Sequence, residues 1–183
     1  NILAGPGKEH LLGCDNIGRD TLTRLLYGAR ISLVTGLLSS IWAAIVGTTI
    51  GLIAGYVGGW VNSAIMRITD AMIAIPPIIF TMVLSAMVTG NLIGISVVIG
   101  VSIIPSYIRM VNGLVMSLRE NDYVTAANLI GQKQLVIMFR HLLPNCLASL
   151  IVTFTMNVGT AIMLESTLSY LGVGIIPPTP AWG

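Results

Sequence analysis

The chain holds few residues that could do chemistry, and their spacing fits none of the common catalytic motifs. Gly7 and Lys8 are followed by Glu9 rather than by Ser or Thr, and the glycine spacing upstream is wrong for a nucleotide-binding P-loop. His10 and His141, the two histidines, cannot form an HExxH zinc motif, and there is neither a GxSxG motif nor a Cys/His cluster. We therefore expect no catalytic residue, no metal site and no cofactor bound by this chain. This pattern favours a conduit or a scaffold over an enzyme.

Three polar side chains inside apolar stretches carry most of the remaining chemical interest. Asn112, Asn157 and Glu165 are candidates for lining a polar substrate path. A carboxylate within a membrane span is costly, and it is a functional hypothesis by default. Two simpler interpretations remain open: the asparagines bond to a neighbouring helix, and Glu165, at the end of its apolar stretch, sits in a wet position at the membrane surface.

The composition places these residues in a membrane protein. Of 183 residues, 55% are hydrophobic and 9% are charged, and the mean hydropathy is +0.90. Soluble domains carry about 25% charged residues. Charge is absent from four long stretches: 31–66, 71–108, 141–164 and 166–183. These values exclude a lone soluble domain, a disordered chain and a nucleic-acid-binding protein.

The lengths of these stretches predict four membrane spans. A transmembrane helix needs about 20 apolar residues, so 31–66 and 71–108 are too long for one crossing each. Gly55, Gly58 and Gly59 end the first span, and Thr89-Gly90-Asn91 separates the second from the third. Backbone groups in lipid must be satisfied internally, which predicts an all-α, polytopic helix bundle with spans at about 32–56, 66–88, 92–115 and 145–166.

Four spans place 1–30 and 167–183 on one side of the membrane and 57–66 and 116–144 on the other. The positive-inside rule leans towards a cytoplasmic 116–144. Four basic residues lie on the side of 1–30, and five lie on or near the side of 116–144: Arg67, Arg109, Arg119, Lys133 and Arg140.

Three local patterns predict how the spans pack. Gly47, Gly51 and Gly55 form a doubled GxxxG stripe, which lets a neighbouring helix approach closely, either in this chain or in a longer protein of which we expect it to be a fragment. Pro76-Pro77 predicts a kink in the second span. Arg67 and Asp70 stand at i, i+3, so they can pair on one helical face at the membrane edge.

The longest polar stretch between spans, 117–145, predicts two short helices. The first covers 123–130, with Asn121 or Asp122 as N-cap and Gly131 at C′. The second covers about 133–142 and ends at Pro144, with one apolar side: Leu135, Val136, Phe139 and Leu142 or Leu143. Ala126 and Ala127 leave the first helix slim on one face, so another protein's groove could close around it. The alternative is an amphipathic connector on the membrane surface.

The same stretch resembles the "EAA" loop of bacterial ABC importer permeases, whose pattern is Glu-Ala-Ala-x3-Gly-x9-Ile-x-Leu-Pro. Here it reads Thr125-Ala126-Ala127, three residues, Gly131, nine residues, and His141-Leu-Leu-Pro144. Residues 10–32 and 168–183 look like two outer stretches of the dipeptide, oligopeptide and nickel permeases, with the strongest match to the C-type, second permease subunit. Thr125 departs from the usual Glu, which removes a salt bridge to the ATPase.

The resemblance implies a type I importer permease fold with six helices, of which this single domain, 1–183, shows four and lacks the first and last. It implies that 116–144 is a cytoplasmic coupling loop and that 1–30 and 167–183 are external. Cys14 and Cys146 would then lie on opposite sides, unable to pair. It assigns ATPase coupling to seven residues: Tyr123, Thr125, Ala126, Ala127, Gly131, Leu143 and Pro144.

The implied machine lies in the prokaryotic plasma (inner) membrane. Its partners are a second permease subunit, two ATPase subunits that bind ATP and Mg, an external substrate-binding protein and the lipid bilayer, with no nucleic acid. The first interpretation is a permease subunit of an importer for peptides, and the second is the same machine carrying nickel or another small solute. The third, from another class, is a channel or membrane scaffold without ATPase. A docking helix in the loop argues against the third, and nothing in the sequence separates the first two.

Overall fold

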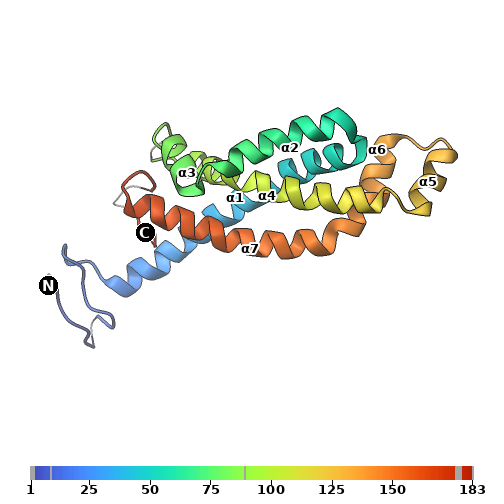
Figure 1. The fold of residues 1–183 in the computed structure, drawn as a ribbon. Helices are drawn as coiled ribbons and strands as arrows, with labels where there is room; N and C mark the ends of the chain where they lie inside the picture. The colour runs from blue at the N-terminus through green and yellow to red at the C-terminus, as the bar shows by residue number, and fades with distance from the viewer. Residues whose placement is uncertain (1–2, 9, 89, 176–178, 183) are drawn as a thin grey trace.

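The computed structural model describes residues 3–8, 10–88, 90–175 and 179–182. The chain passes along the bundle four times (Figure 1). The passes are α1 (Thr21–Val57), α2 (Gly59–Ala74) with α3 (Pro77–Ser85), α4 (Leu92–Leu118) and α7 (Leu143–Tyr170). Between α4 and α7 lie α5 (Asp122–Leu129), α6 (Gln134–Val136) and the π-helical turn η1 (Ile137–Leu142).

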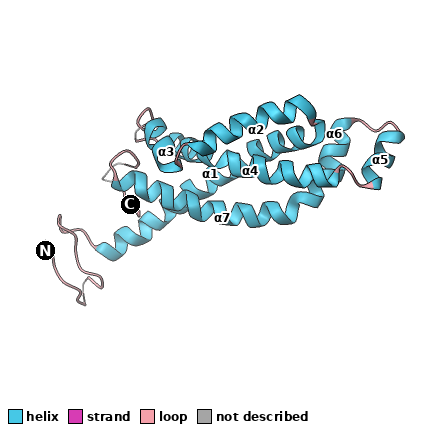
Figure 2. Cartoon of the chain, in the orientation of Figure 1, coloured by secondary structure: helices cyan, strands magenta, loops and turns pink. Residues whose placement is uncertain are grey.

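Helices and loops account for the described residues, apart from one isolated bridge between Cys14 and Asp20 (Figure 2). Three helices are long and apolar enough to cross a membrane, and α2 with α3 makes a fourth if the bent pair is one span. Both chain ends lie at one end of the bundle, and α5 and α6 lie at the other. The predicted all-α transmembrane bundle is therefore confirmed.

The first helix is longer than its predicted span. It begins at Thr21, where the Asp20 carboxylate accepts a hydrogen bond from the Thr23 amide at 2.8 Å. Residues 21–30, the last third of the segment 1–30 that was expected to be external, are thus helical, because the arginines there do not break a helix that an N-cap has started. Gly55 stays inside the helix. The break comes at Gly58 and Gly59, whose φ angles of 69° and 54° favour glycine.

The second span is broken rather than kinked. The axes of α2 and α3 differ by 88°, so the bend lies at Pro76-Pro77 as predicted but is sharper than a kink. Ile75 is extended, with φ −89° and ψ 125°, because a residue before proline is pushed out of the helical region. Pro76 and Pro77 have no N–H to continue the hydrogen bonds of α2.

Close contact between α1 and α4 forms the centre of the bundle. A Cβ built on Gly47 would lie 2.6 Å from the Tyr107 Cβ, and one on Gly55 would lie 2.8 Å from the Val115 Cβ. Tyr107 and Val115 are fully buried at this contact. The doubled GxxxG stripe therefore packs closely as predicted, but its partner is α4 of the same chain and not an absent span.

The connector before the last span differs from the prediction. The second short helix does not end at Pro144, because α6, η1 and α7 follow one another without a break. In a π-helical turn each N–H bonds to the carbonyl five residues earlier rather than four. The changed bonding pattern accommodates Pro144, whose nitrogen has no hydrogen to donate to the preceding turn. The Asn145 side-chain amide donates to the His141 carbonyl at 2.6 Å.

The π turn also changes which residues face inward. Ile137 and Leu142, five residues apart, are both fully buried, and Met138 is 6% exposed. Leu135 and Phe139, predicted to share one apolar side with Leu142, are instead 65% and 49% exposed. A spacing of five aligns on a π-helix, whereas the prediction assumed α-helical spacing.

Replacing Gly51 with alanine should destabilise the helix bundle. The new Cβ would lie 2.9 Å from both the Ile108 carbonyl oxygen and the Val111 Cβ, so α1 and α4 must separate at a cost of about 1–3 kcal/mol. The measurement is the thermal unfolding midpoint of the purified full-length protein in detergent. Gly113→Ala is the matched control, because nothing lies within 4 Å of its added Cβ. Equal midpoints for the two variants would contradict the close contact.

Candidate functional site

The short helix α5 stands at the end of the bundle opposite the chain termini. Its C-terminus is a Schellman motif: the Gly131 amide donates to the Asn128 carbonyl at 3.0 Å, and the Gln132 amide donates to the Ala127 carbonyl at 3.1 Å. Gly131 has φ +76°, which a glycine adopts without strain. The sequence prediction of a helix over 123–130 with Gly131 at C′ is confirmed.

The two faces of α5 have different surroundings. Val124 and Ala127, 1% and 5% exposed, pack into a core cluster with Val115 and Leu142. The outer residues are exposed and mixed: Asp122, Thr125 and Asn128 are polar, whereas Leu129 is apolar and 83% exposed. The helix therefore presents apolar surface outward at Leu129 while its inner face is fixed to the bundle. Apolar side chains gathered on an exposed loop are typical of a protein-contact surface.

The structure sorts the seven predicted coupling residues. The exposed ones are Tyr123, Thr125, Ala126, Gly131 and Pro144. Leu143 is half-buried and lines an apolar groove between α1 and α7. The prediction that Ala127 belongs to the slim outer face is wrong. Ala127 follows Val124 by three residues, so it lies on the same inward face of the helix.

Polar contacts fasten this end of the bundle to α1. Arg119, after the last residue of α4, donates to the Gly55 carbonyl at 3.1 Å and so satisfies part of the C-terminus of α1. The Tyr56 hydroxyl donates to the Asn128 side-chain oxygen at 3.2 Å, which ties α1 to α5. Sequence reasoning missed Arg119 and Tyr56, although Arg119 lies where the apolar pattern of the third span ends. A displacement of α5 would therefore reach α1 as well as α4.

A lateral groove of about 660 Å³ lies where α2 breaks, between α2, α3, α4 and α7. Four uncharged polar residues line it beside apolar ones: Ser102, Ser106, Asn157 and Thr160. The Asn157 amide donates to the Ser106 hydroxyl at 3.1 Å, across α7 and α4. Of the three candidate path residues, the structure places only Asn157 in this groove.

The other two candidate path residues are buried elsewhere. Asn112 is 6% exposed, and its backbone carbonyl lies beside Gly55 of α1. Glu165 has no exposed surface, and its carboxylate accepts hydrogen bonds from Ser32 and Ser169, each at 2.8 Å. A wet surface position for Glu165 is therefore wrong, because α1 covers it.

An ion pair borders the groove. Arg109, which lines it, donates to Asp70 of α2 at 2.5 Å, and their side chains are 53% and 60% exposed. The i, i+3 spacing had suggested that Asp70 pairs with Arg67. Asp70 instead pairs with Arg109 on a neighbouring helix. Sequence reasoning treated Arg109 as a residue near the loop, although its place inside the predicted span 92–115 was a signal of a special role.

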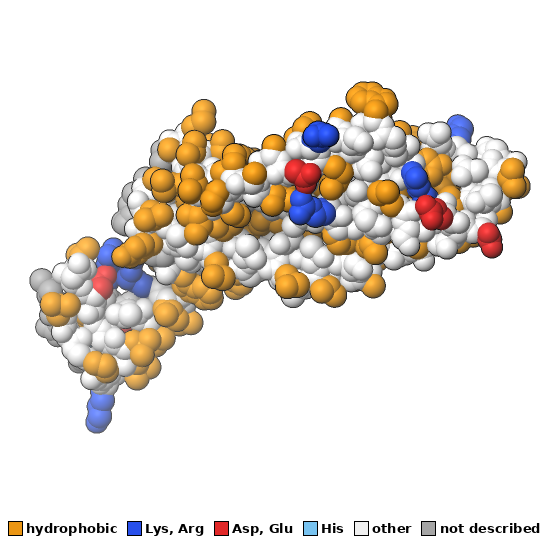
Figure 3. All heavy atoms as spheres, viewed as in Figure 1, with side chains coloured by type: hydrophobic (Ala, Val, Ile, Leu, Met, Phe, Trp, Pro, Cys, Tyr) orange, Lys and Arg blue, Asp and Glu red, His pale blue; other side chains and the backbone are white. Residues whose placement is uncertain are grey.

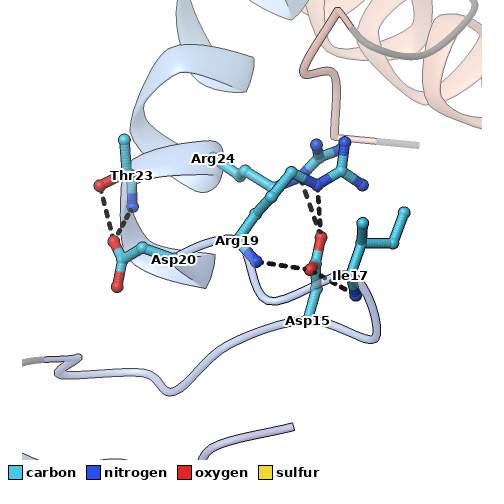
Figure 4. Close-up of polar contacts among 6 residues, drawn as sticks. All are labelled: Asp15, Ile17, Arg19, Asp20, Thr23 and Arg24. Atoms are coloured by element: carbon cyan, nitrogen blue, oxygen red, sulfur yellow. Dashed lines mark hydrogen bonds and ion pairs between the residues drawn. The ribbon is translucent and has the colours of Figure 1, made fainter. Parts of the chain in front are cut away.

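Hydrogen bonds to the Asp15 carboxylate hold the segment before α1 in its fold (Figure 4). Asp15 accepts from the amides of Arg19 and Ile17 at 2.8 and 2.9 Å and pairs with the Arg19 guanidinium at 2.8 Å. Arg24 of α1 approaches the same carboxylate at 3.9 Å. The bond from the Arg19 amide contributes most to lowering the pKa of Asp15 from 3.8 to about 2.

The described C-terminal residues fold onto the same end. The Trp182 indole donates to the Leu25 carbonyl at 3.1 Å. The two stretches expected to be external thus share one surface, although 176–178 and 183 lie outside the described residues. Cys14 and Cys146 are both free thiols. In the described part of the chain, no group of three or more His, Cys, Asp or Glu side chains could hold a metal ion.

Comparison with known proteins gives one family and a set of close relatives. The family described as "Binding-protein-dependent transport system inner membrane component" matches residues 47–183. A Brucella suis protein, provisionally named a peptide transport system permease, is 44% identical over 178 residues, covering 97% of this chain and 60% of the relative. The glutathione transport system permease protein GsiD of Pectobacterium atrosepticum is 38% identical over 98% of this chain and 60% of its own length. The chain therefore spans about three-fifths of these relatives.

The segment over 10–20 should loosen in acid, where Asp15 becomes protonated. A carboxyl whose pKa is lowered by folding contributes full stability above its unfolded value and loses that contribution as the pH falls towards the folded value. We expect amide hydrogen exchange in 10–20, corrected for intrinsic rates, to accelerate between pH 3.8 and about 2. Asp15→Asn should accelerate it already at pH 7, whereas Asp122→Asn, at the opposite end of the bundle, should not. Unchanged exchange in Asp15→Asn would contradict the role of this carboxylate.

Proposed function

The chain belongs to the family of binding-protein-dependent transport system inner membrane components, and on this premise we propose that it is a permease subunit of an ATP-driven importer. The family match confirms the resemblance to importer permeases and the inner-membrane location that it implied. A transport permease is not itself an enzyme. In the proposal, ATP and Mg bind to two partner ATPase subunits, and this chain converts their motion into passage of the substrate.

The observation that carries the proposal is α5 with its two unlike faces. Leu129 and Ile130, 83% and 74% exposed, form an apolar edge at the end of the bundle away from the chain termini. Such an edge is satisfied by a complementary groove on a partner. We assign that groove to an ATPase subunit, with Tyr123, Thr125, Ala126 and Gly131 at the contact. Leu143 and Pro144 support the helix from the start of α7.

The inner face of α5 supplies the route for force. Val124 and Ala127 pack in the same cluster as Val115 of α4 and Leu142 before α7. Because packed cores deform little, a shift of α5 moves the adjoining ends of α4 and α7. The lateral groove lies between these helices, so the shift changes its shape. In the proposal, a second permease subunit closes the groove, and a binding protein delivers substrate to the end formed by 10–30 and 179–182.

Peptides are the proposed substrate class. The relatives named above are peptide and glutathione transport permeases, which favours peptides over nickel as the cargo. Import of nickel or another small solute by the same machine remains the alternative, tested by loading the partner binding protein. A channel or scaffold without ATPase is disfavoured, because α5 would then have no partner for its apolar edge.

Gly131→Leu should uncouple ATP hydrolysis from uptake. A side chain at φ +76° is strained although nothing lies within 4 Å of the added Cβ, so the Schellman motif opens and α5 loses its end. In the reconstituted complex we expect loss of substrate-stimulated ATPase activity and uptake with normal membrane insertion. Gly131→Asn is the matched control, because asparagine tolerates this backbone region. Normal coupling in Gly131→Leu would exclude docking through α5.

Leu129→Glu separates contact from folding. Leu129 is 83% exposed, so the substitution leaves the bundle core intact and places a charge on the proposed contact. The complex should lose its ATPase subunits during purification, whereas Leu12→Glu, an exposed leucine at the other end, should retain them. Retention of the ATPase subunits in Leu129→Glu would contradict the assigned surface.

The two ends of the bundle should face opposite compartments. Cys14 is nearly buried and Cys146 is fully buried, so neither reports reliably on its side. In a cysteine-free full-length chain, Leu12→Cys (50% exposed) should react with a membrane-impermeant maleimide in intact cells whose outer barrier is permeable to it. Leu129→Cys should react only after the inner membrane is opened. The reverse pattern would invert the proposed orientation.

A further inference from the structure

The Asp70–Arg109 pair lies at membrane depth on an outer face of the bundle. Arg109 precedes the end of α4 by nine residues, roughly 14 Å at 1.5 Å per residue. Both side chains are more than half exposed. Figure 3 shows an acidic side chain beside basic ones midway along the bundle, over α2 and α4, surrounded by apolar and neutral surface. Charges within a span face a water-filled path or a protein partner, since lipid would desolvate them.

The broken helix points to the same face independently. The carbonyl of Ile73 would bond to the N–H of residue 76 or 77 in a continuing helix, but both are prolines. Irregular backbone at membrane depth is tolerated where it is buried in protein or lines a water-filled cavity. Ile73 and Pro77 line the groove of about 660 Å³ with Arg109, so the freed backbone group and the guanidinium border one space. That volume lies within the usual range for small-molecule sites, about 300–1,000 Å³.

The charges around the groove do not balance. Asp70 has a second cation within reach, because Arg67 precedes it by three residues on α2 and is exposed. Among the described residues, Arg67 forms no ion pair. Two arginines against one aspartate leave a local charge of +1, which one further carboxylate would neutralise.

We propose that Arg109 is a carboxylate-binding residue of the substrate path and that Asp70 is its exchangeable counter-ion. A peptide's terminal carboxylate takes the place of Asp70 on the guanidinium, which can hold a carboxylate through two parallel hydrogen bonds. Asp70 then turns to Arg67 on its own helix. The exchange converts one ion pair into two, so Arg67, Arg109, Asp70 and the peptide carboxylate are all paired. The peptide's terminal ammonium is a further charge that these residues do not pair. This assignment rests on the proposed function and adds the chemical group that the path recognises.

The test compares acids with amides in the assembled transporter. The full-length permease, its partner subunits and its binding protein are reconstituted in liposomes, and uptake of di-, tri- and penta-alanine is measured beside their C-terminal amides. The same binding protein serves every assay, so its own preference cancels when variants are compared. Arg109→Gln should lower uptake of the imported acid by about tenfold, in line with loss of a charged hydrogen bond, while uptake of the amide changes little. Arg67→Gln should lower acid uptake in the same direction.

A charge-swapped double variant distinguishes recognition of the peptide carboxylate from an ion pair that only holds α2 and α4 together. Asp70→Arg with Arg109→Asp keeps an ion pair between α2 and α4 but presents an anion to the groove. We expect normal assembly of the complex with loss of acid uptake. Recovery of acid uptake in the double variant, or an equal loss of acid and amide uptake in Arg109→Gln, would overturn the assignment and leave the pair as a helix tie. If the unmodified complex imports none of the alanine peptides, the proposed peptide function fails, and this assignment fails with it.

Discussion

The absence of hydrogen-bonding solvent in the bilayer core is the constraint on which the rest of this structure depends. Every backbone group and charge within the spans must find a partner in protein or in an enclosed aqueous path. Most of the chain meets this demand with long helices, and Glu165 meets it with two serine hydroxyls in a contact sealed by α1. The break at Pro76-Pro77 and the exposed Arg109 are exceptions in the span region, and both border one groove. Because exceptions are costly in lipid, their shared position indicates a wet or partner-facing surface.

A second consequence of the bilayer is that packing, not apolar burial, must hold the helices together. Lipid tails are as apolar as leucine, so association needs close contact. The glycine stripe of α1 provides it by letting Tyr107, Val111 and Val115 of α4 approach the α1 backbone. Val115 also belongs to the cluster under α5. The contact that stabilises the bundle thus continues directly into the contact that fixes the loop helix.

Features encoded by local chemistry were predictable from the sequence. Gly131 needed only the C′ preference of glycine, and the all-α membrane bundle needed only the length of the charge-free stretches. Features set by neighbouring helices were not predictable. Asp70 has an arginine three residues before it, yet it pairs with Arg109 because α4 lies beside α2. Nothing in the sequence distinguishes Ala127 from Ala126. Ala127 is buried and Ala126 is exposed only because the core lies beneath one face of α5. The buried face of 134–142 was predicted wrongly, because no local sequence pattern indicates a π-helical turn.

The arrangement of α4 connects the two proposed sites in one rigid element. Val115 touches the cluster beneath α5, and Arg109 borders the groove six residues earlier, on the same uninterrupted helix. Arg119 adds a bond from the end of α4 to the end of α1. The break between α2 and α3 leaves the opposite wall of the groove without such a continuous link. In the proposal, a displacement that begins at α5 reaches Arg109 through α4, so the Asp70–Arg109 pair that borders the groove is the contact between α2 and α4 that this motion would test.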